Sequence, residues 1–194
     1  MNARDEILAR ARARQAAATG PTHTPGDTMP CTPRPGDADR FAERLADYRA
    51  LVTRCAPEGL SRSVAAALAG VPAVIVPDDA PREWLAHYDG RVVTDVDAAD
   101  AVLTGCAAAV AETGTVILDA GPAQGPRVLS LIPDHHICIV RAAQIHADVP
   151  DAVAALRSTA PQTWISGPSA TSDIELDRVE GVHGPRRLHV ILVR

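Results

Sequence analysis

The chain has few aromatic side chains: two Trp, two Tyr and one Phe make up 3% of its 194 residues. Apolar residues still account for 46% of the sequence, close to the average for globular proteins. A sizeable core can therefore be buried, but it must be built from Ala, Val, Leu and Ile. This composition disfavours an aromatic-rich β-sandwich and favours a sheet covered by helices of small residues.

Positive charge and long apolar runs are also scarce. The formal net charge is −5, and the arginine clusters are too short to form a nucleic-acid-binding surface. The longest apolar run, 64–77, is shorter than the ~18 residues of a membrane span and contains Pro72. The N-terminus has arginines but lacks the apolar region of a secretory signal. We expect a cytoplasmic protein that neither binds nucleic acid nor spans a membrane.

Cysteine motifs and the common catalytic motifs are missing. The four cysteines are scattered without a C-x-x-C, so we expect free thiols and no cofactor bound by this chain. No P-loop, G-x-G-x-x-G, G-x-S-x-G or H-E-x-x-H occurs. The histidines lack the i, i+4 pairing of a metal-binding helix, so the sequence supports no metal site.

The sequence predicts three consecutive parts. Residues 1–18 favour a helix, with acidic residues at its start and arginines at its end. Residues 19–37 contain five Pro, five Thr and three Gly, which is typical of a flexible linker. Residues 38–194 form the predicted α/β domain.

Short apolar strands alternate with helices in this domain. We expect helices at 38–52, 60–69, 81–88 and 149–158, and strands at 73–76, 91–93, 101–104, 115–118, 136–140, 163–166 and 188–193. This alternation predicts a mostly parallel sheet with helices on both faces. Ligands of such sheets bind at the carboxyl ends of strands, here the loops after Leu118, Val140 and Ser166.

The first candidate segment for chemistry is Glu112-Thr113-Gly114-Thr115, at the start of a predicted strand. A carboxylate that loses its water contacts there can act as a nucleophile or general base. Gly114 would allow a substrate to approach the backbone. The alternative is an ion pair of Glu112 with an arginine such as Arg127, next to an ordinary turn.

The second segment follows the predicted strand 163–166 and is rich in hydroxyls. Backbone N–H groups and hydroxyls there would bind a phosphate or a carboxylate. Equally, Ser172 and Glu175 match the spacing of a capping box, and Asp173 suits the first turn of a helix for structural reasons. The candidate binding residues are Ser166, Gly167, Ser169, Thr171, Asp173 and Glu175.

Two further candidates lie on either side of this segment. His183, followed by Gly184, occupies a loop from which it could act as an acid, a base or a hydrogen-bond donor. His189, within a strand, is expected to be structural. Arg127 and Ser130 offer a cation and a hydroxyl to an acidic ligand, unless they belong to a surface helix with a buried apolar face.

Four motifs taken together resemble the LUD-domain family, in its lactate-utilisation protein C subgroup. They are Ala-Glu-Thr-Gly-Thr before an aliphatic strand, Arg-x-x-Ser-Leu-Ile-Pro-x-His-His-Ile, Ser-Gly-Pro-Ser-x-Thr-x-Asp-Ile-Glu, and Gly-Val-His-Gly-Pro-x-x-Leu-His-Val-Ile-Leu-Val. The resemblance covers roughly 41–194 and is dense from residue 101 onward.

The resemblance implies a NagB/RpiA/CoA-transferase-like α/β fold and a role in oxidising L-lactate to pyruvate. Two iron–sulfur proteins would be its partners and would carry the clusters. Glu112-Thr113-Gly114 also looks like the Glu-x-Gly segment that carries the nucleophilic glutamate of CoA transferases, although no CoA site is recognisable. Glu112 and His183 are therefore the candidate catalytic residues.

Three hypotheses remain open from the sequence. The first is a subunit of a lactate-oxidising system that binds a small carboxylate, such as lactate or pyruvate, or a partner subunit. The second is a stand-alone enzyme acting on a phosphorylated sugar or an acyl-CoA, by analogy of fold. The third is a non-catalytic scaffold that holds partners through its N-terminal helix.

Overall fold

The structure, a computed structural model, describes residues 3–17, 32–156, 160–171, 179–180 and 184–194. The chain forms two compact units, Met1–Pro30 and Cys31–Arg194. The first unit holds α1 (Ala3–Ala17), which has acidic residues in its first turn and Arg14 in its last. This order of charges favours the helix dipole, and the described part agrees with the predicted helix.

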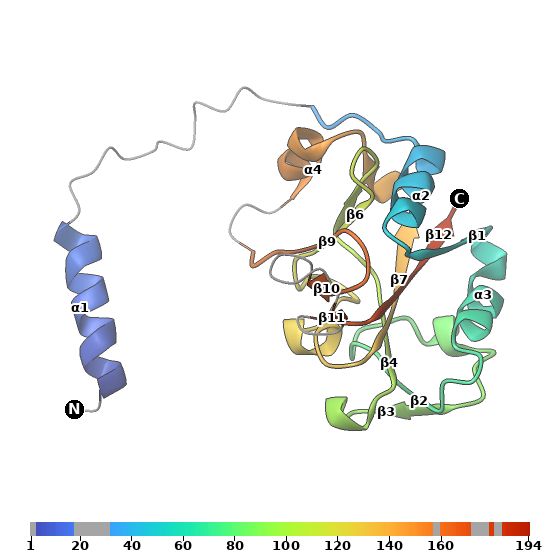
Figure 1. Ribbon diagram of the computed structural model, residues 1–194, viewed down its shortest axis with the longest axis horizontal. Helices are drawn as coiled ribbons and strands as arrows, with labels where there is room; N and C mark the ends of the chain where they lie inside the picture. The colour runs from blue at the N-terminus through green and yellow to red at the C-terminus, as the bar shows by residue number, and fades with distance from the viewer. Residues whose placement is uncertain (1–2, 18–31, 157–159, 172–178, 181–183) are drawn as a thin grey trace. The chain divides into compact units, whose positions relative to one another are not determined.

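The second unit is built around a six-stranded sheet and a four-stranded sheet (Figure 1). The larger sheet is parallel throughout, in the order β1-β12-β7-β4-β2-β3. The smaller one has the order β8-β5-β6-β9 and mixes parallel and antiparallel pairs. The strands are β1 (Leu51–Cys55), β2 (Ala73–Ile75), β3 (Arg91–Val93), β4 (Ala101–Thr104), β5 (Ala108–Val110), β6 (Thr115–Leu118), β7 (His135–Arg141), β8 (Ile145–His146), β9 (Thr163–Ile165), β10 (Ala170–Thr171), β11 (Val179–Glu180) and β12 (Arg187–Val193).

The helices of this unit are short, and two of its α-helices begin at an aspartate cap. Asp37 accepts hydrogen bonds from two backbone N–H groups at the start of α2, and Asp148 accepts one from Asp151 in α4. The α-helices are α2 (Ala38–Asp47), α3 (Leu60–Ala67) and α4 (Val149–Ala155), and the 3₁₀ helices are η1 (Pro57–Gly59), η2 (Arg82–Leu85), η3 (Val96–Ala98), η4 (Arg127–Ser130) and η5 (Ala142–Gln144).

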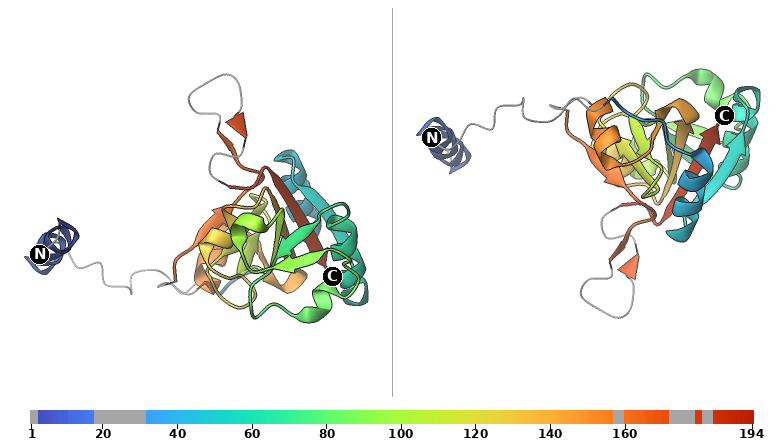
Figure 2. Two further views of the ribbon diagram at one scale, coloured as in Figure 1. Left: turned by 90° about the horizontal axis from the view of Figure 1, so that it is seen from below. Right: turned by 90° about the horizontal axis from the view of Figure 1, so that it is seen from above.

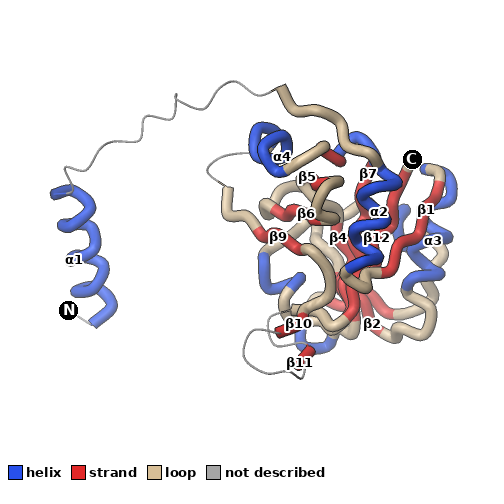
Figure 3. The backbone as a smooth tube through the Cα atoms, turned by 45° about the horizontal axis from the view of Figure 1, so that its top comes forward, coloured by secondary structure: helices blue, strands red, loops and turns tan. Residues whose placement is uncertain are grey.

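The core is layered, and each central strand contributes side chains to two layers. The small sheet and α3 lie on opposite sides of the large sheet (Figure 3). On one face of the large sheet, Ile137 and Ile191 pack with Val64 of α3 and Trp84 of η2. On the other face, alternate residues of the same strands pack against the small sheet and α2. The small sheet in turn packs Ile117 against Ala152 of α4. Strands buried on both faces explain the continuous apolar runs in the sequence.

The expectation of a mostly parallel sheet with helices is confirmed, but one face of that sheet is covered differently. Besides α2, a second sheet lies over this face. Its β5 and β8 were not expected, because Ala108–Val110 lacks a distinct strand pattern and Ile145–His146 is only two residues long.

The predicted helices 38–52 and 81–88 are wrong in extent. Helix α2 ends at Asp47, and Leu51–Cys55 forms β1 instead. The change of direction occurs at Arg49, whose φ is 64°. The second prediction shortens to the single 3₁₀ turn Arg82–Leu85.

Residues 32–37, which the composition assigns to the linker, belong to the second unit and pack against its strands and helices. The N–H of Gly36 donates to the carbonyl of Ile145 at 2.8 Å, and Pro35 forms an isolated bridge with His146. Arg34 pairs with Asp148 and with the buried Asp151. The remaining residues of the predicted linker lie outside the described part of the chain.

β10 and β11 form a short antiparallel pair that projects from the body of the second unit (Figure 2). Thr171 of this pair lies opposite Val179. The candidates Asp173, Glu175 and His183 fall outside the described residues.

Candidate functional site

A row of hydroxyls joins two of the segments that the sequence singles out. The Oγ1 atoms of Thr113 and Thr115 lie 2.7 Å apart, and Oγ1 of Thr115 lies 2.7 Å from Oγ of Ser166. Pairing of β6 with β9 brings them together, because Val116 lies opposite Ile165. Thr115 is buried and Ser166 is exposed, so the row leads from the protein interior to the surface.

Glu112, next to this row, is not withdrawn from water as its position suggests. Its side chain is 56% exposed, and Oε1 lies 3.5 Å from Nη2 of Arg40 in α2. The ion pair expected as the alternative therefore exists, but its partner is Arg40 and not Arg127. The burial on which a nucleophilic role depends is absent.

Two glycines of the candidate segments serve to pack their loops against α2. Gly114 has a φ of 62°, and a Cβ there would lie 2.8 Å from the backbone of Arg44 and Leu45. Gly167 has a φ of 127°, and its Cβ would lie 2.8 Å from Cβ of Tyr48. A helix, and not an open substrate path, therefore occupies the space beside Gly114.

The loop after β9 also meets the loop that precedes β12. The N–H of Ser169 donates to the carbonyl of Pro185 at 2.9 Å, which places Gly184 beside this hydroxyl-rich loop. The described part of the second and third candidate segments is thus contiguous.

Arg127 and Ser130 form a separate group in η4. Nη1 of Arg127 donates to Oγ of the buried Ser130 at 3.1 Å, and that hydroxyl donates to the carbonyl of Arg127 at 3.2 Å. These two residues line a hollow of about 70 Å³, which is completed by Leu118, Ala120, Gly125, Pro161 and Thr163. A single water needs only about 10–15 Å³, so a small ligand group fits here.

The predicted site is therefore divided in two. The hydroxyl row lies where β6 begins and β9 ends, whereas the hollow lies where β6 ends and β9 begins. Four residues of strand separate them, a length of about 10 Å. One small ligand cannot contact Thr115 and Arg127 at once.

Three histidines lie in the large sheet, within the first three residues of β7 and β12. Nε2 of His136 lies 2.8 Å from Oγ1 of Thr104, and Nε2 of His189 lies 2.8 Å from Oγ1 of Thr53. The rings of His135 and His189 stack with their centroids 6.3 Å apart. Hydrogen bonding of His189 agrees with the structural role expected for it.

Burial controls the protonation of these rings. Desolvation, helped by nearby Arg187 and His189, lowers the pKa of His135 to about 4. Desolvation, with smaller contributions from His135 and Arg127, lowers the pKa of His136 to about 3. Both rings are neutral at pH 7. Within the described ranges, no three side chains of His, Cys, Asp or Glu are grouped as ligands for a metal ion.

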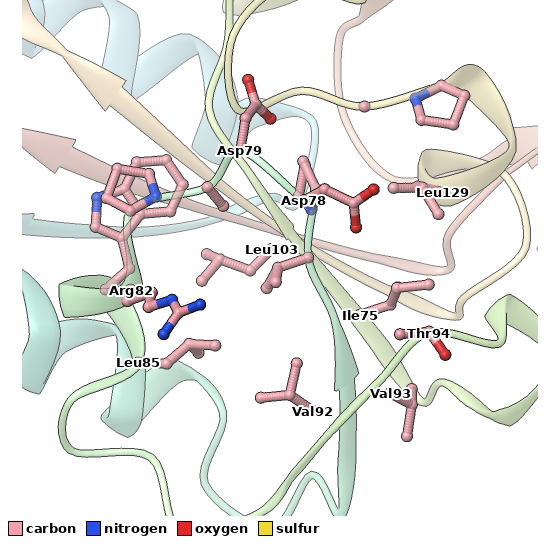
Figure 4. A pocket seen from close by; sticks show the side chains of 17 residues that line it. Ile75, Asp78, Asp79, Arg82, Leu85, Val92, Val93, Thr94, Leu103 and Leu129 are labelled. Carbon is pink, nitrogen blue, oxygen red and sulfur yellow. The ribbon is translucent and has the colours of Figure 1, made fainter.

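A second, larger cavity was not predicted from the sequence. It has a volume of about 670 Å³ and opens where β2 and β3 end, beside Leu103 of β4 (Figure 4). Its walls come mainly from the loop 76–82 and from the turn at Gly125–Pro126. Gly125 lines this cavity and the smaller hollow alike. The available signal was the run Pro77-Asp78-Asp79 directly after a buried strand.

No helix in the described part of the chain combines the length and apolarity needed to cross a membrane.

The two stacked sheets, with polar groups and hollows where their strands end, define a mixed α/β protein with ligand-sized sites. Comparison with known proteins identifies the particular family. Residues 88–193 match the LUD domain, and the chain belongs to the LUD-domain family. The resemblance seen in the four sequence motifs is thereby confirmed.

Curated relatives extend the match beyond this domain. The chain is 48% identical over 185 residues to "Lactate utilization protein C" of Deinococcus radiodurans, which covers 86% of the chain and 87% of that protein. It is 36% identical to "Lactate utilization protein C" of Halalkalibacterium halodurans, over 55% of the chain and 50% of that protein. The aligned part thus spans about half of the second relative.

A solved structure agrees with the fold. The crystal structure of a DUF162 family protein from Deinococcus radiodurans superimposes with a TM-score of 0.66 at 41% sequence identity. The match covers 80% of this chain and 95% of the other.

Proposed function

We propose that the protein is a component of an L-lactate utilisation system, in which it binds a small carboxylate such as lactate or pyruvate. The observation that carries this proposal is the 48% identity, over 86% of the chain, with Lactate utilization protein C of Deinococcus radiodurans. A location in the cytoplasm is part of the same proposal.

The hollow at Arg127 supports the choice of ligand. A guanidinium can form two parallel hydrogen bonds with a carboxylate. Arg127 places its guanidinium group at the hollow, beside the hydroxyl of Ser130. The volume of about 70 Å³ suits a small acid and excludes a large one. The hydroxyl row at Thr115 would instead serve proton transfer or a partner surface, since it lies at the opposite end of β6.

Two iron–sulfur proteins are proposed as partners, with the clusters on their chains. The thiolate form of cysteine binds such clusters, whereas a hydrogen bond with Cys138 and burial raise the pKa of the Cys106 thiol well above its usual value. Cys138 is also buried. These two thiols suit the core of the domain and do not suit a cluster.

Complementation tests the proposal. The chain is expressed in a Deinococcus radiodurans strain that lacks its Lactate utilization protein C, and growth on L-lactate is measured. We expect the wild-type chain to restore growth and Arg127→Gln to fail. The matched control is Arg62→Gln, which changes an exposed arginine of α3 that does not line either cavity. Glu112→Gln, assayed alongside, shows whether this exposed carboxylate has a catalytic role.

A pull-down from the same lactate-grown cells tests the partners. The tagged chain should co-purify with iron-containing proteins that oxidise lactate, and Arg127→Gln should keep those partners while losing activity. If the folded wild-type chain neither restores growth nor co-purifies with iron, the proposal is wrong.

A further inference from the structure

The large cavity lies at the point in the sheet where the direction of chain progression reverses. From β2 the chain continues to β3 on one side, whereas the strand that follows β4 in this sheet is β7, on the other side. β2 and β4 are neighbours, so their connections diverge at their carboxyl ends. Parallel sheets bind ligands in the crevice at such a point, and the cavity is found there.

The floor and walls of the cavity are mostly apolar. Ile75, Val93, Leu103 and Leu129 line the cavity, and Pro77, Pro81 and Pro126 add apolar ring carbons. A volume of about 670 Å³ falls within the range of about 300–1,000 Å³ that is typical of organic ligands. It is far larger than lactate or pyruvate requires. The interior therefore suits a ligand with a sizeable apolar or aromatic part.

Two charged side chains at the cavity lack a partner. Among the described residues, neither Asp78 nor Arg82 makes a hydrogen bond or an ion pair, and both are exposed. In Figure 4 they approach the cavity from two sides, with Leu103 between them. Asp79 is different, because its carboxylate accepts a hydrogen bond from the N–H of Ala123 at 2.8 Å and so fixes the loop.

We propose that this cavity binds a nucleoside monophosphate. The planar base would lie on the apolar floor, the ribose hydroxyls would donate to the carboxylate of Asp78, and the phosphate would accept hydrogen bonds from Arg82. The base, the hydroxyls and the phosphate leave the ribose in three directions, so a base on the apolar floor leaves the hydroxyls and the phosphate free to reach a carboxylate and a guanidinium at two sides of the cavity. This site is distinct from the hollow at Arg127 and does not depend on a role in lactate utilisation.

Calorimetric titration of the purified chain with AMP, GMP, CMP and UMP tests the site. We expect at least one of them to bind with one-to-one stoichiometry. Arg82→Gln should weaken that binding by at least about tenfold, because a charge-assisted hydrogen bond is lost. Arg62→Gln, the matched control, should leave it unchanged.

Ligand analogues assign the two contacts separately. For AMP, the analogues are adenosine, which lacks the phosphate, and 2′,3′-dideoxy-AMP, which lacks the ribose hydroxyls. The preference for AMP over adenosine should disappear in Arg82→Gln, and the preference over the dideoxy analogue should disappear in Asp78→Asn. Both side chains are exposed, so the variants should keep the wild-type melting temperature.

Failure to bind any of the four nucleotides at millimolar concentration would overturn the proposal. Equal weakening by Arg62→Gln and Arg82→Gln would also overturn it, since binding would then reflect general charge attraction. Neither result affects the growth assay on L-lactate.

Discussion

Nε2 of His136 lies 2.8 Å from Oγ1 of Thr104, while Nδ1 of the same ring is buried without a partner in the described structure. The ring is therefore held in its neutral form, because protonation would place a charge in the core without a counterion. His135, whose ring nitrogens are likewise unpartnered in the described structure, is in the same situation.

Stability should consequently fall in acid. In the unfolded chain both histidines titrate near pH 6.5, whereas the folded pKa values are about 4 and about 3. Above pH 6.5 both states are neutral and stability is complete. As the pH falls from 6.5 toward 4 the unfolded chain binds more protons, so the free energy of unfolding decreases by about 1.4 kcal/mol per pH unit for each histidine.

Urea unfolding between pH 7.5 and 4.5 measures this slope. His136→Gln keeps a hydrogen-bonding side chain without a titratable ring, and it should reduce the slope by about 1.4 kcal/mol per pH unit. His87→Gln, which changes an exposed histidine outside the sheet, serves as the control variant. Identical slopes in wild type and His136→Gln would contradict the assignment.

Gly114→Ala should destabilise the protein through two effects, a left-handed backbone and contact with α2. Gly70 provides the matched control, because its φ is 76° but a Cβ there meets nothing within 4 Å. We expect Gly70→Ala to cost about 1 kcal/mol and Gly114→Ala at least about 1 kcal/mol more. Urea unfolding at pH 7.5 measures both. If both variants lose the same unfolding free energy, α2 accommodates the added methyl group at position 114 without an energetic penalty.

Thr115→Val should interrupt the hydroxyl row without changing the volume of the side chain. The hydroxyls of Thr113 and Ser166 then lose their common partner, at a cost of about 1 kcal/mol. If the row serves function, growth on L-lactate should fail at a temperature where the variant is folded, and Thr115→Ser should restore it. Normal growth on L-lactate with Thr115→Val would show that the hydroxyl row has only a structural role.

Asp151→Asn should release residues 32–36 from the domain. The carboxylate of Asp151 is buried and accepts hydrogen bonds from the backbone N–H of Arg34 at 3.1 Å and from its Nε. Hydrogen exchange of the Gly36 amide should become faster, and stability should fall by about 1–3 kcal/mol. Asp47→Asn, which alters only an exposed pair with Arg44, should change neither. Unchanged exchange at Gly36 in Asp151→Asn would show that other contacts hold this segment.

The sequence predicts the central strands well because their pattern of apolar residues depends only on neighbouring positions in the chain. Val102 and Val190 belong to apolar runs that have no exposed face, and such runs are typical of buried parallel strands. Leu51 and Val52 were assigned to a helix because they continue the spacing of Phe41 and Leu45. A residue at positive φ, Arg49, ends that helix in the structure, and no glycine or proline marks the position.

The arrangement of the site depends on pairings between distant segments. The contact of Thr115 with Ser166 requires antiparallel pairing over 51 positions, which residue patterns do not specify. The burial of Glu112 was overestimated for the same reason, since α2 contributes Arg40 and leaves the carboxylate at the surface. The large cavity is formed by three loops, none of which carries a recognised motif.

Gly125 belongs to the walls of both the large cavity and the hollow at Arg127. Gly125 has a φ of 67°, and Leu129 and Pro77 lie close to it. The turn therefore cannot move at the large cavity without also moving at the hollow. A ligand that moves the turn from one side therefore changes the shape offered on the other. Thermodynamic linkage makes such an influence equal in both directions, so nucleotide and carboxylate would alter each other's affinity by the same factor.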